Sequence, residues 1–491
     1  MALLRKVTIK LERSNMIIKM TPWVPGVESI LTYDHVTFGI GSSKMRSTVE
    51  KKALYRIDTT GKFGYFPAGM LESVIEFIKN KSDYDIKYKD YRSGNLMSLK
   101  PDTSKLPPLR PGQKEAIDAV INHDHGMLVC GTGFGKSFII KCLCSIYPTA
   151  RFIIVAPGQN DVKNLYYRIK EDFPKETSLL CTGSKDSADN RIVISTTKSM
   201  IKADFHRCDF FIYDEAHGCG QNESTQKLLS HLEHSRIYGF TATPTGRGDR
   251  SDKIMEALFG PIIFERTYQE CEETGTVSPI EVFVYDIPGS IETGSRYDTF
   301  VTRKRKLYWR NEERNLSIAC LAKALPEDEN VLIMVETVDH MMNIAKYLPE
   351  YTLVLGGSED VLKRAKACKI KLKNTIADNP KAVKQVYNDF KSGIIKKVIA
   401  TYVWKQAVDF EGLSVLIRAD GSPSAIASYQ IPGRLSRLAA GKKRGVLIDF
   451  KDTFNALALR NFYARLKTYK KNGWQIIHRG SVLDEKFSDS V

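Results

Sequence analysis

The feature that most constrains this chain is a glycine-rich loop, Cys130-Gly131-Thr132-Gly133-Phe134-Gly135-Lys136-Ser137. It stands between a short apolar stretch, Met127 to Val129, and an apolar helical segment that begins near Ser137. A strand that turns through glycines into a helix starts a parallel α/β unit, and its backbone N–H groups can surround a phosphate. Lys136 would neutralise β- and γ-phosphate charge, and the Ser137 hydroxyl would bind Mg²⁺. The loop therefore predicts an α/β fold with a nucleotide site.

The alternative is a glycine-rich turn before a buried helix, with no ligand. The usual phosphate-loop pattern has Gly or Ala where this chain has Cys130. The strand before the loop, the helix after it and an acidic motif downstream all favour the nucleotide site.

Composition indicates a multidomain globular protein with a polyanionic partner. A length of 491 residues predicts about three domains, and 42% apolar residues are enough for full cores. The formal charge of +16 and the pI near 9.2 favour nucleic acid, since basic surfaces attract phosphate backbones. A merely lysine-rich enzyme is the alternative.

The nine cysteines have no paired spacing, which argues against a disulfide framework. We expect reduced thiols in a reducing compartment, most of them packed as small hydrophobes. No apolar leader and no run of about 20 apolar residues occurs. A soluble cytoplasmic protein is the expectation.

Hydrophobic patterning divides the chain into five segments. Residues 1–95 mix short alternating segments with one helix, Pro67 to Asn80, and predict a small α+β module that binds DNA. A polar linker follows at 96–108. Residues 109–275 and 276–452 each alternate apolar strands with helices, and 453–491 form a basic C-terminal helix and tail.

The two alternating regions predict two parallel-sheet lobes in tandem. Strands are expected at Met127–Val129, Phe152–Ala156, Arg191–Ser195, Asp209–Tyr213, Arg236–Phe240, Val331–Val335, Tyr351–Leu355, Lys397–Ala400, Val415–Ile417 and Val446–Ile448. Helices are expected at Val162–Phe173, Glu312–Ala324, Val338–Tyr347, Ala382–Phe390 and Ala425–Ala439. Only the first lobe has a phosphate loop, so the pattern favours a paired-lobe ATPase with a cleft between its lobes.

An apolar strand in the first lobe ends in two carboxylates, Asp214 and Glu215, followed by Ala216 and His217. Ligands of open α/β sheets bind at the carboxyl ends of strands. Asp214 would hold Mg²⁺ and Glu215 would polarise the attacking water. A solvated acidic pair is the alternative for any lone Asp-Glu, but the phosphate loop favours the catalytic interpretation.

Two further motifs follow in order. Gly239 to Pro244, GFTATP, places hydroxyls at the same sheet edge and predicts a coupling segment. Gln430 to Arg437, QIPGRLSR, lies at the start of or within a predicted helix, where Arg434 and Arg437 would share one face. Such arginines can reach a γ-phosphate, whereas a solvated basic face is the alternative.

The ordered set of Gln113, CGTGFGKS, Ser195-Thr196-Thr197, DEAH, TAT and QIPGRLSR resembles superfamily 2 helicases over residues 109 to 450. Within them the chain is similar to the phage recombination helicases of the UvsW type. The resemblance implies two RecA-like lobes, with ATP and Mg²⁺ as ligands and a host-cell cytoplasmic location if the chain is phage-encoded.

The resemblance also implies residue roles. Gln113 matches the adenine-reading residue, and Asp409 and Gln430 match nucleotide-contacting positions of the second lobe. The usual Gly-x-Asp appears as Ala407-Val408-Asp409, which departs from the family pattern. Positions that hold the nucleic-acid backbone match Pro157, Thr196, Thr197 and Thr401.

Basic residues cluster at Arg303–Lys306, along 363–373 and in the tail, where Lys470 and Trp474 are candidates for contact with nucleic acid. Each cluster alone is more often a solvated face. A motor that steps over every sequence grips phosphates, so we expect contact without sequence readout.

The sequence predicts an ATP-dependent DNA helicase or translocase on branched DNA, namely forks, D-loops, R-loops or Holliday junctions. The resemblance implies 3′–5′ movement, and we expect a monomeric motor. The alternatives are an RNA helicase, the ATPase motor subunit of a restriction or remodelling complex, and a binding module with an inactive ATPase site. The presence of Lys136, Asp214, Glu215, Arg434 and Arg437 disfavours the last of these.

Overall fold

The structure, a computed structural model, divides into two compact units. It describes residues 7–14, 16–40, 45–81, 83–91, 99–184, 186–203, 208–219, 223–230, 232, 235–243, 252–292, 298–355, 374–401, 404, 412–439 and 441–481. The first unit comprises Met1–Gly39 and Ser47–Thr267, and the main part of the second is Tyr268–Val491.

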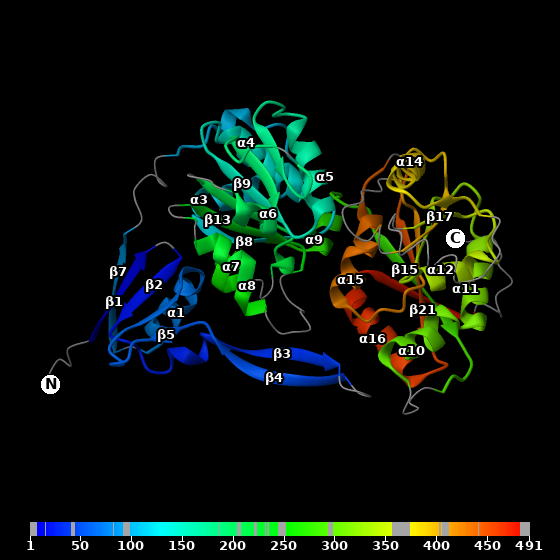
Figure 1. The fold of residues 1–491 in the computed structure, drawn as a ribbon, viewed down its shortest axis with the longest axis horizontal. Coiled ribbons are helices and arrows are strands. Elements are labelled where there is room, and N and C mark those ends of the chain that lie inside the picture. The colour runs from blue at the N-terminus through cyan, green and yellow to red at the C-terminus, as the bar shows by residue number, and fades with distance from the viewer. Residues whose placement is uncertain are drawn as a thin grey trace. The chain divides into compact units, whose positions relative to one another are not determined.

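The first unit begins with the small α+β module (Figure 1). Its five-stranded sheet has the order β5-β6-β2-β1-β7, in which only the β1–β7 pair is parallel. The strands are β1 (Val7–Ser14), β2 (Ile17–Thr21), β5 (Arg56–Ile57), β6 (Gly64–Pro67) and β7 (Tyr84–Asp90). Helix α1 (Leu71–Lys79) buries Leu71, Val74 and Ile78 against one face of this sheet. A two-stranded ribbon, β3 (Thr32–Ile40) and β4 (Met45–Ala53), is inserted between β2 and β5.

The module is packed directly on the first lobe. A methyl group at Gly69 would come within 2.2 Å of the Glu256 carbonyl oxygen on α8 (Asp252–Phe259), so only glycine fits this approach. The Ser73 hydroxyl donates to the Glu256 carboxylate at 2.6 Å, and Ala257 belongs to the module's own apolar core. Because apolar and polar contacts both cross this boundary, the module is a fixed part of the first unit.

The first lobe is built on a seven-stranded parallel sheet of order β10-β11-β9-β12-β13-β8-β14. The strands are β8 (His125–Cys130), β9 (Phe152–Ala156), β10 (Thr177–Leu180), β11 (Ile192–Thr196), β12 (Phe210–Asp214), β13 (Arg236–Thr241) and β14 (Ile262–Arg266). All five predicted strands are present, and β10 and β14 are additions at the two edges. The inner strands are wholly buried, which explains their unbroken apolar sequences.

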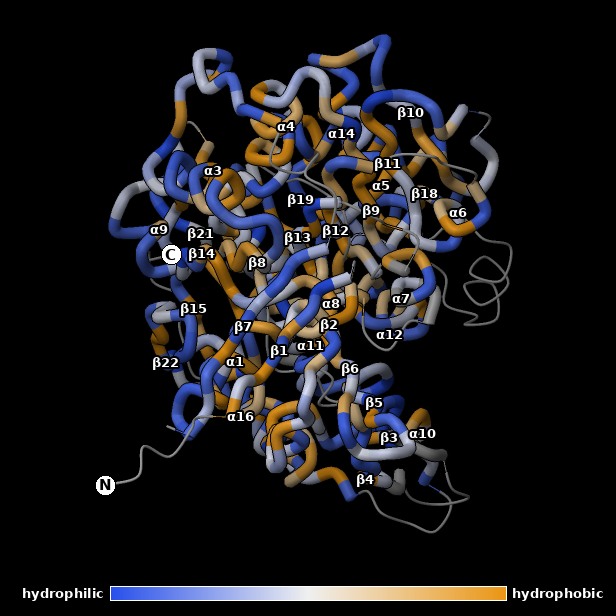
Figure 2. The backbone as a smooth tube through the Cα atoms, turned by 90° about the vertical axis from the view of Figure 1, so that its left-hand side faces the viewer, coloured by the Kyte–Doolittle hydropathy of each residue, from blue (hydrophilic) through white to orange (hydrophobic). Residues whose placement is uncertain are grey.

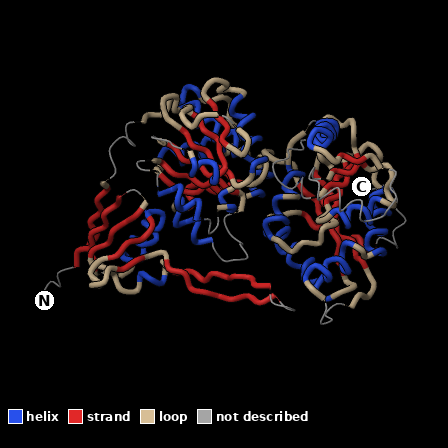
Figure 3. The backbone as a smooth tube through the Cα atoms, in the orientation of Figure 1, coloured by secondary structure: helices blue, strands red, loops and turns tan. Residues whose placement is uncertain are grey.

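Helices flank both faces of this sheet (Figure 3). They are α3 (Gln113–Asn122), α4 (Lys136–Ile146), α5 (Gln159–Lys170), α6 (Thr197–Lys202), α7 (Glu223–Ser230) and α8. Helix α4 starts at the phosphate loop and α5 covers the segment predicted as amphipathic. Their apolar faces fill the core between sheet and helices.

The second unit contains an eight-stranded parallel sheet of order β18-β17-β19-β16-β20-β21-β15-β22. The strands are β15 (Ile280–Ile287), β16 (Val331–Met334), β17 (Thr352–Val354), β18 (Ile376–Ala377), β19 (Lys397–Ala400), β20 (Val415–Arg418), β21 (Gly445–Asp452) and β22 (Gln475–Ser481). The prediction of two parallel-sheet α/β lobes with a small N-terminal module is therefore confirmed.

Helices of the second unit agree with the predictions at three of four places. They are α9 (Tyr268–Glu273), α10 (Phe300–Lys304), α11 (Glu312–Ala324), α12 (Val338–Ala345), α14 (Pro380–Lys391), α15 (Ala425–Gln430) and α16 (Ala456–Lys471). A π-helical turn, Arg305–Trp309, joins α10 to α11. The single helix predicted over Ala425–Ala439 is wrong: α15 ends at Gln430 and a 3₁₀ turn, Pro432–Ser436, follows because proline interrupts the helical hydrogen bonds.

The segment predicted as a basic tail is part of the second lobe in its described portion. Helix α16 packs on β21 and β22 joins the sheet edge beside β15. The eight described cysteines are free, and seven of them are buried as expected. Among the helices in the described part of the chain, none combines the length and apolar character needed to cross a bilayer.

Candidate active site

The strand register of the first lobe gathers its motifs on one edge of the sheet. Asp214 at the end of β12 pairs with Phe240 of β13, and Thr241 pairs with Val129 of β8, just before the phosphate loop. On the other side, Thr196 of β11 pairs with Ala156 of β9. Since all these strands are parallel, their carboxyl ends form one row, which is where α/β sheets bind ligands.

The phosphate loop has the backbone that its glycines predict. Gly135, the residue before α4, has a φ of 102°, and a Cβ there would lie 2.7 Å from the Gln113 amide nitrogen. Phe134 is fully buried and stacks on Phe264, which holds the loop against β14. Cys130 is also fully buried at the end of β8, so this position needs a small side chain whether or not it is glycine. The departure from the usual pattern therefore leaves the loop geometry intact.

Gln113, the first residue of α3, forms a hydrogen bond with the phosphate loop. Its amide nitrogen donates to the Phe134 carbonyl at 2.9 Å, and its amide oxygen accepts from the Arg110 backbone N–H at 3.0 Å. The side chain is buried, with 2% exposed. Gln113 thus lies beside the loop that would hold the phosphates, although both ends of its amide are already bonded within the protein.

Lys136 and the two carboxylates lie together above the loop. The Lys136 ammonium is 3.9 Å from the Glu215 carboxylate and donates to the Cys130 carbonyl at 3.5 Å. The Glu215 backbone N–H donates to Asp214 Oδ1 at 3.1 Å. A cation from the phosphate loop and two carboxylates from the end of β12 therefore lie close together.

Glu215 has an unusual backbone. Its φ of 54° and ψ of 51° lie in the left-handed region, and among the described residues it is the one non-glycine residue with a positive φ. This conformation costs about 1–3 kcal/mol and occurs mainly where a site requires it. Glu215 lies between the end of β12 and the 3₁₀ turn Ala216–Gly218.

The acidic motif contacts the TAT segment. His217 Nδ1 lies 3.2 Å from the Glu215 carboxylate and 3.3 Å from the Thr241 hydroxyl. The Thr243 backbone N–H donates to the same Thr241 hydroxyl at 3.1 Å. His217 therefore links the candidate base to the segment that the sequence predicted to couple the site to nucleic acid.

Electrostatics favour a cation beside Asp214. Burial, together with the neighbouring Glu215 charge, raises the pKa of Asp214 to about 7, against the opposing effect of Lys136. A carboxylate that is costly to ionise without a cation fits the oxygen ligands that Mg²⁺ prefers. Ser137, in the first turn of α4, carries the hydroxyl expected on the same ion. The residues present thus fit a Mg²⁺–nucleotide ligand.

The nucleic-acid positions expected in the first lobe differ in accessibility. Pro157 is exposed directly after β9, and Thr196 caps α6, with its hydroxyl accepting the Ser199 N–H at 3.3 Å. Thr197 is only 4% exposed, and its hydroxyl lies 3.4 Å from that of Tyr213. The hydroxyl of Thr197 is therefore buried rather than free for a phosphate, which corrects that expectation.

In the second unit, Arg434 lies in the 3₁₀ turn and Arg437 in the extended residue that ends it. They do not share an α-helical face, so that expectation is wrong: Pro432 ends the hydrogen bonding of α15, and the 3₁₀ turn after it stops before the extended Arg437. The Arg434 guanidinium donates to the Trp404 carbonyl and is 6% exposed, whereas Arg437 is partly exposed. Lys442 braces the turn by donating to the Leu435 carbonyl at 2.6 Å.

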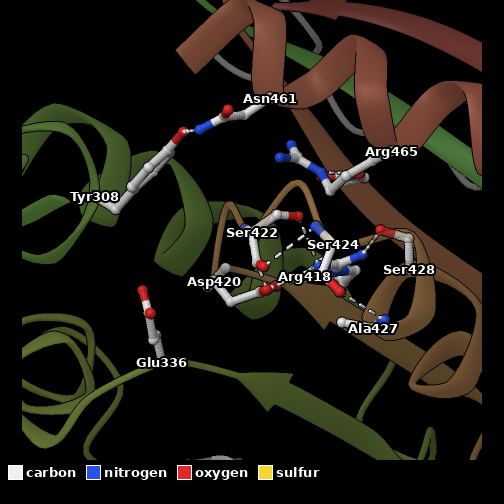
Figure 4. A network of polar contacts seen from close by, with 12 residues as sticks. Tyr308, Glu336, Arg418, Asp420, Ser422, Ser424, Ala427, Ser428, Asn461 and Arg465 are labelled. Atoms are coloured by element: carbon white, nitrogen blue, oxygen red, sulfur yellow. Dashed lines mark hydrogen bonds and ion pairs between the residues drawn. The ribbon is translucent and has the colours of Figure 1, made fainter. Parts of the chain in front are cut away.

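A buried polar network holds the segment that leads to these arginines (Figure 4). Arg418, at the end of β20, forms two hydrogen bonds with the Asp420 carboxylate at 2.9 and 2.8 Å and donates to the Ser428 hydroxyl at 2.9 Å. Ser424 caps α15 by accepting the Ala427 N–H. Arg418 and Asp420 are essentially unexposed, so the β20–α15 connection has a single well-defined arrangement.

The tail residues expected to contact nucleic acid separate into buried and exposed positions. Trp474 is 4% exposed and stacks between Tyr429 and Tyr469, at centroid distances of 6.2 and 5.5 Å. Its ring is therefore unavailable for a base, which corrects the expectation. Arg465 is likewise buried, paired with Asp449 at 2.8 Å, while Lys470 is exposed.

For the remaining predicted positions the structure gives fewer contacts. Thr401 is partly buried just after β19, and Gln430 is the last residue of α15. Asp409 and the basic stretch 363–373 lie outside the described residues. In the Arg303–Lys306 cluster, Lys304 pairs with Glu336, and Lys306 with Asp298 at 2.8 Å.

The fold and the site together define a class of protein. Two parallel-sheet α/β lobes are present, and the first carries a glycine-rich loop after β8 and an acidic pair at the end of β12, with β13 between these two strands. Residues 106–246, essentially the nucleotide-binding lobe, match the family described as "Type III restriction enzyme, res subunit".

Curated relatives are similar over part of their length. "Putative ATP-dependent RNA helicase QP509L" of African swine fever virus is 24% identical over 327 residues, covering 61% of this chain and 57% of the relative. The match thus spans little more than half of that relative. "DNA 3'-5' translocase XPB2" of Sulfurisphaera tokodaii is 26% identical over 164 residues, 33% of this chain and 36% of the relative.

Solved structures agree on the fold. Dbp5 of S. cerevisiae, bound to RNA and ADP BeF3, has a TM-score of 0.52 at 14% identity, covering 79% of this chain and 94% of Dbp5. T4 UvsW covers 96% of this chain and 99% of its own at 16% identity, with a TM-score of 0.42. The first of these similarities shows the two-lobed helicase fold.

Sequence reasoning assigned no role to several residues that shape the site. Asp161 in the first turn of α5 contributes to the raised pKa of Asp214, and Lys442 and Arg418 brace the arginine segment. No motif marks these residues, because their roles depend on strands that meet only in the fold.

Proposed function

We propose that this chain is an ATP-driven helicase or translocase that moves along nucleic acid. One observation carries the proposal: Lys136, Asp214 and Glu215 converge at the carboxyl edge of the first sheet, beside the phosphate loop. A merely structural loop has no need of a partly buried carboxylate pair with a left-handed backbone at this place.

In this proposal each residue has one role. Lys136 and the loop N–H groups would bind the β- and γ-phosphates, and Ser137 and Asp214 would hold Mg²⁺, which would supply positive charge beside the transferred group. Glu215 orients the attacking water and accepts its proton as the bond to the γ-phosphorus forms and the bond to ADP breaks. Arg434 and Arg437 stabilise the charge that develops on the γ-phosphoryl group.

Contact with the nucleic acid is assigned to the strand ends beside the ATP site. Pro157 and Thr196 follow the neighbouring strands β9 and β11, and Thr401 follows β19 in the second lobe. His217 contacts both Glu215 and the Thr241 hydroxyl, so the candidate base is linked to the TAT segment at the same sheet edge. We assign to this segment the coupling of hydrolysis to the grip on the phosphate backbone.

We assign branched DNA as the substrate, with 3′–5′ movement and a monomeric motor. The basic composition and the resemblance to UvsW-type helicases support DNA, as does the name of the archaeal relative. The name of the viral relative supports RNA as the alternative.

The experiment compares ATP hydrolysis and unwinding with forked DNA, a four-way junction, linear duplex DNA and matched RNA. We expect stimulation by the branched DNAs and loss of turnover in Lys136→Ala. Stimulation by RNA alone would exclude the DNA assignment. ATP turnover that survives in Lys136→Ala would exclude the site itself.

A further inference from the structure

The N-terminal module has one sheet face that no described element covers. Along β1, Ile9 and Leu11 are buried toward α1, whereas Lys10 between them is exposed. The same alternation continues on β2, where Lys19 lies between the buried Ile18 and Met20. The face opposite α1 is therefore an outer face in contact with solvent.

Strand register aligns side chains of this outer face in rows. Glu12 of β1 lies between Lys89 of β7 and Lys19 of β2. Beyond Lys19 the row continues through Tyr65 of β6 to Arg56 of β5. It crosses all five strands, a width of about 19 Å at ~4.8 Å per strand. Two residues along β1, Lys10 pairs with Lys87 and begins a parallel basic row.

Aromatic rings are interleaved with these cations. Tyr65 is 38% exposed and Tyr91, directly after β7, is 53% exposed. Phe63 packs edge-on against Tyr65 at 5.7 Å, and the Lys19 ammonium lies 4.5 Å from the Phe63 ring centroid. Lys89 lies 4.5 Å from the Tyr91 ring in the same way. Exposed rings beside ammonium groups are the composition of surfaces that stack on bases and pair with phosphates.

The charge of the outer face is positive. Among the strand residues that alternation places on this face are five cations, Lys10, Lys19, Arg56, Lys87 and Lys89, and two carboxylates, Glu12 and Asp85. Glu12 accepts a hydrogen bond from the Tyr91 hydroxyl at 2.9 Å. Within the described part of the chain, Lys10, Arg56 and Lys87 form no ion pair. Figure 2 draws β7 largely in the hydrophilic colour.

The outer face is held at a fixed place on the first lobe. Arg13, on the opposite side of β1, pairs with Asp124 before β8 at 3.5 Å. The close approach of Gly69 to Glu256 and the Ser73 hydrogen bond also join the module to helix α8 of the first lobe. A ligand on the outer face would therefore move with the lobe that contains the phosphate loop.

We propose that the outer face binds a single-stranded segment of the nucleic acid on which the motor acts. Phosphates pair with Lys10, Lys87 and Arg56, and unpaired bases stack on Tyr65 and its neighbouring rings. A sheet face of this width with exposed aromatics stacks two or three bases in other nucleic-acid-binding folds. A single strand fits better than a duplex, because the rings of paired bases are not open to stacking. This inference rests on the proposed function, which supplies the nucleic acid.

The test measures binding of the full chain to fluorescein-labelled 20-nucleotide oligothymidylate and to a blunt 20-base-pair duplex by anisotropy. Lys10→Glu/Lys87→Glu removes two phosphate contacts, and Tyr65→Ala removes a stacking ring. The matched control is Lys175→Glu/Lys323→Glu, which changes the charge equally at two exposed lysines elsewhere.

For the lysine pair we expect weaker oligothymidylate binding and a salt-dependence slope reduced by about 1.4, at ~0.7 per single-strand phosphate contact. For Tyr65→Ala we expect about 5- to 150-fold weaker binding, the range for one lost stacking contact. Tyr65→Trp should show fluorescence quenching when the oligonucleotide binds, and this variant keeps the ring if Tyr65→Ala fails to fold.

Three outcomes overturn the inference in distinguishable ways. Binding of both variants equal to that of the control would exclude the outer face while leaving the proposed function intact. If the variants lose affinity only for the duplex, the outer face binds duplex instead of a single strand. If the unaltered chain neither binds these probes nor shows nucleic-acid-stimulated ATP hydrolysis, the proposed function fails first.

Discussion

The Lys136 ammonium lies 3.9 Å from the Glu215 carboxylate at the carboxyl edge of the first sheet. Lysine from the loop and glutamate from the end of β12 thus already form an ion pair across the candidate site. A nucleotide phosphate would compete for the same ammonium, because both are anions. Binding of the substrate would therefore release Glu215 to orient a water.

Glu215→Gln should separate binding from hydrolysis. The amide keeps the shape of the side chain but cannot accept a proton, so turnover should fall by about 10²- to 10⁴-fold. Affinity for Mg²⁺–ATP should be retained or increased, because a negative charge near the phosphates is lost. Single-turnover hydrolysis and equilibrium binding of a fluorescent ATP analogue measure the two effects. Equal loss of both would contradict the assigned role.

The two arginines should differ in their structural contributions. Either Arg434→Ala or Arg437→Ala should reduce turnover by about 10³- to 10⁵-fold if both act on the γ-phosphate. Arg434→Ala should also lower the unfolding free energy by about 1–3 kcal/mol, because its guanidinium bonds the Trp404 carbonyl in a buried place. Thermal unfolding of the two variants, compared with their kinetics, checks this difference. Turnover unaffected in both would remove the arginines from the site.

Trp474→Ala should weaken the fold of the second lobe rather than its contact with nucleic acid. Removing a buried aromatic side chain costs about 3–5 kcal/mol, and this ring packs between Tyr429 and Tyr469. Chemical denaturation measures the loss. Lys470→Ala, at an exposed position four residues earlier, is the matched control for stability. Unchanged stability together with weaker oligonucleotide binding would restore the original interpretation of Trp474.

His340 should make the second lobe sensitive to acid. Burial, with a smaller contribution from Arg314, lowers the pKa of His340 to about 3, and its Nε2 lies 3.1 Å from the Asn315 side-chain oxygen. Below pH ~6.5 the His340 imidazole is protonated in the unfolded chain but stays neutral in the folded chain. Stability due to this group is therefore complete above that pH and declines by about 1.4 kcal/mol per unit as the pH falls toward 3.

His340→Gln keeps a side-chain N–H for Asn315 and removes the titration. Its unfolding free energy should fall less steeply between pH 6 and 4 than that of the unaltered chain. Urea denaturation at a series of pH values provides the measurement. Parallel pH profiles for the two proteins would show that another group is responsible.

Gly69→Val should loosen the module from the first lobe. The added side chain would meet the Glu256 carbonyl oxygen at a distance that no real contact has, so the backbone must shift. We expect a loss of about 1–3 kcal/mol and faster proteolysis of the N-terminal module. Ser73→Ala, which removes only the hydrogen bond to Glu256, should have a smaller effect. Equal proteolysis rates in the two variants would contradict close packing at Gly69.

The sequence predicted most of the inner strands, but it missed the inner strand β15 and the edge strands β10, β14, β18 and β22. Inner strands such as β9 are apolar without interruption because both faces are covered, and this signal is local. Edge strands such as β22 mix exposed and partly buried residues, and their pairing partner β15 lies almost 200 residues earlier. Such a strand is defined by its partner rather than by its own composition.

The candidate site shows the same division. The phosphate loop and the acidic pair are contiguous motifs and could be predicted residue by residue. Arg465 resembles a surface cation in the sequence, yet Asp449 pairs with it inside the lobe. Pro432 marks the end of α15 in the sequence, whereas no local signal shows that the turn after it stops at Ser436, before Arg437.

The contact at Gly69 has a consequence for any exchange of parts between motors of this kind. A side chain larger than hydrogen at Gly69 would fill the space in which the module meets the backbone of helix α8. The N-terminal 95 residues therefore cannot be fused to another motor as an independent domain. A chimera that joins them to another motor would need the matching backbone surface of Glu256 and Ala257 as well.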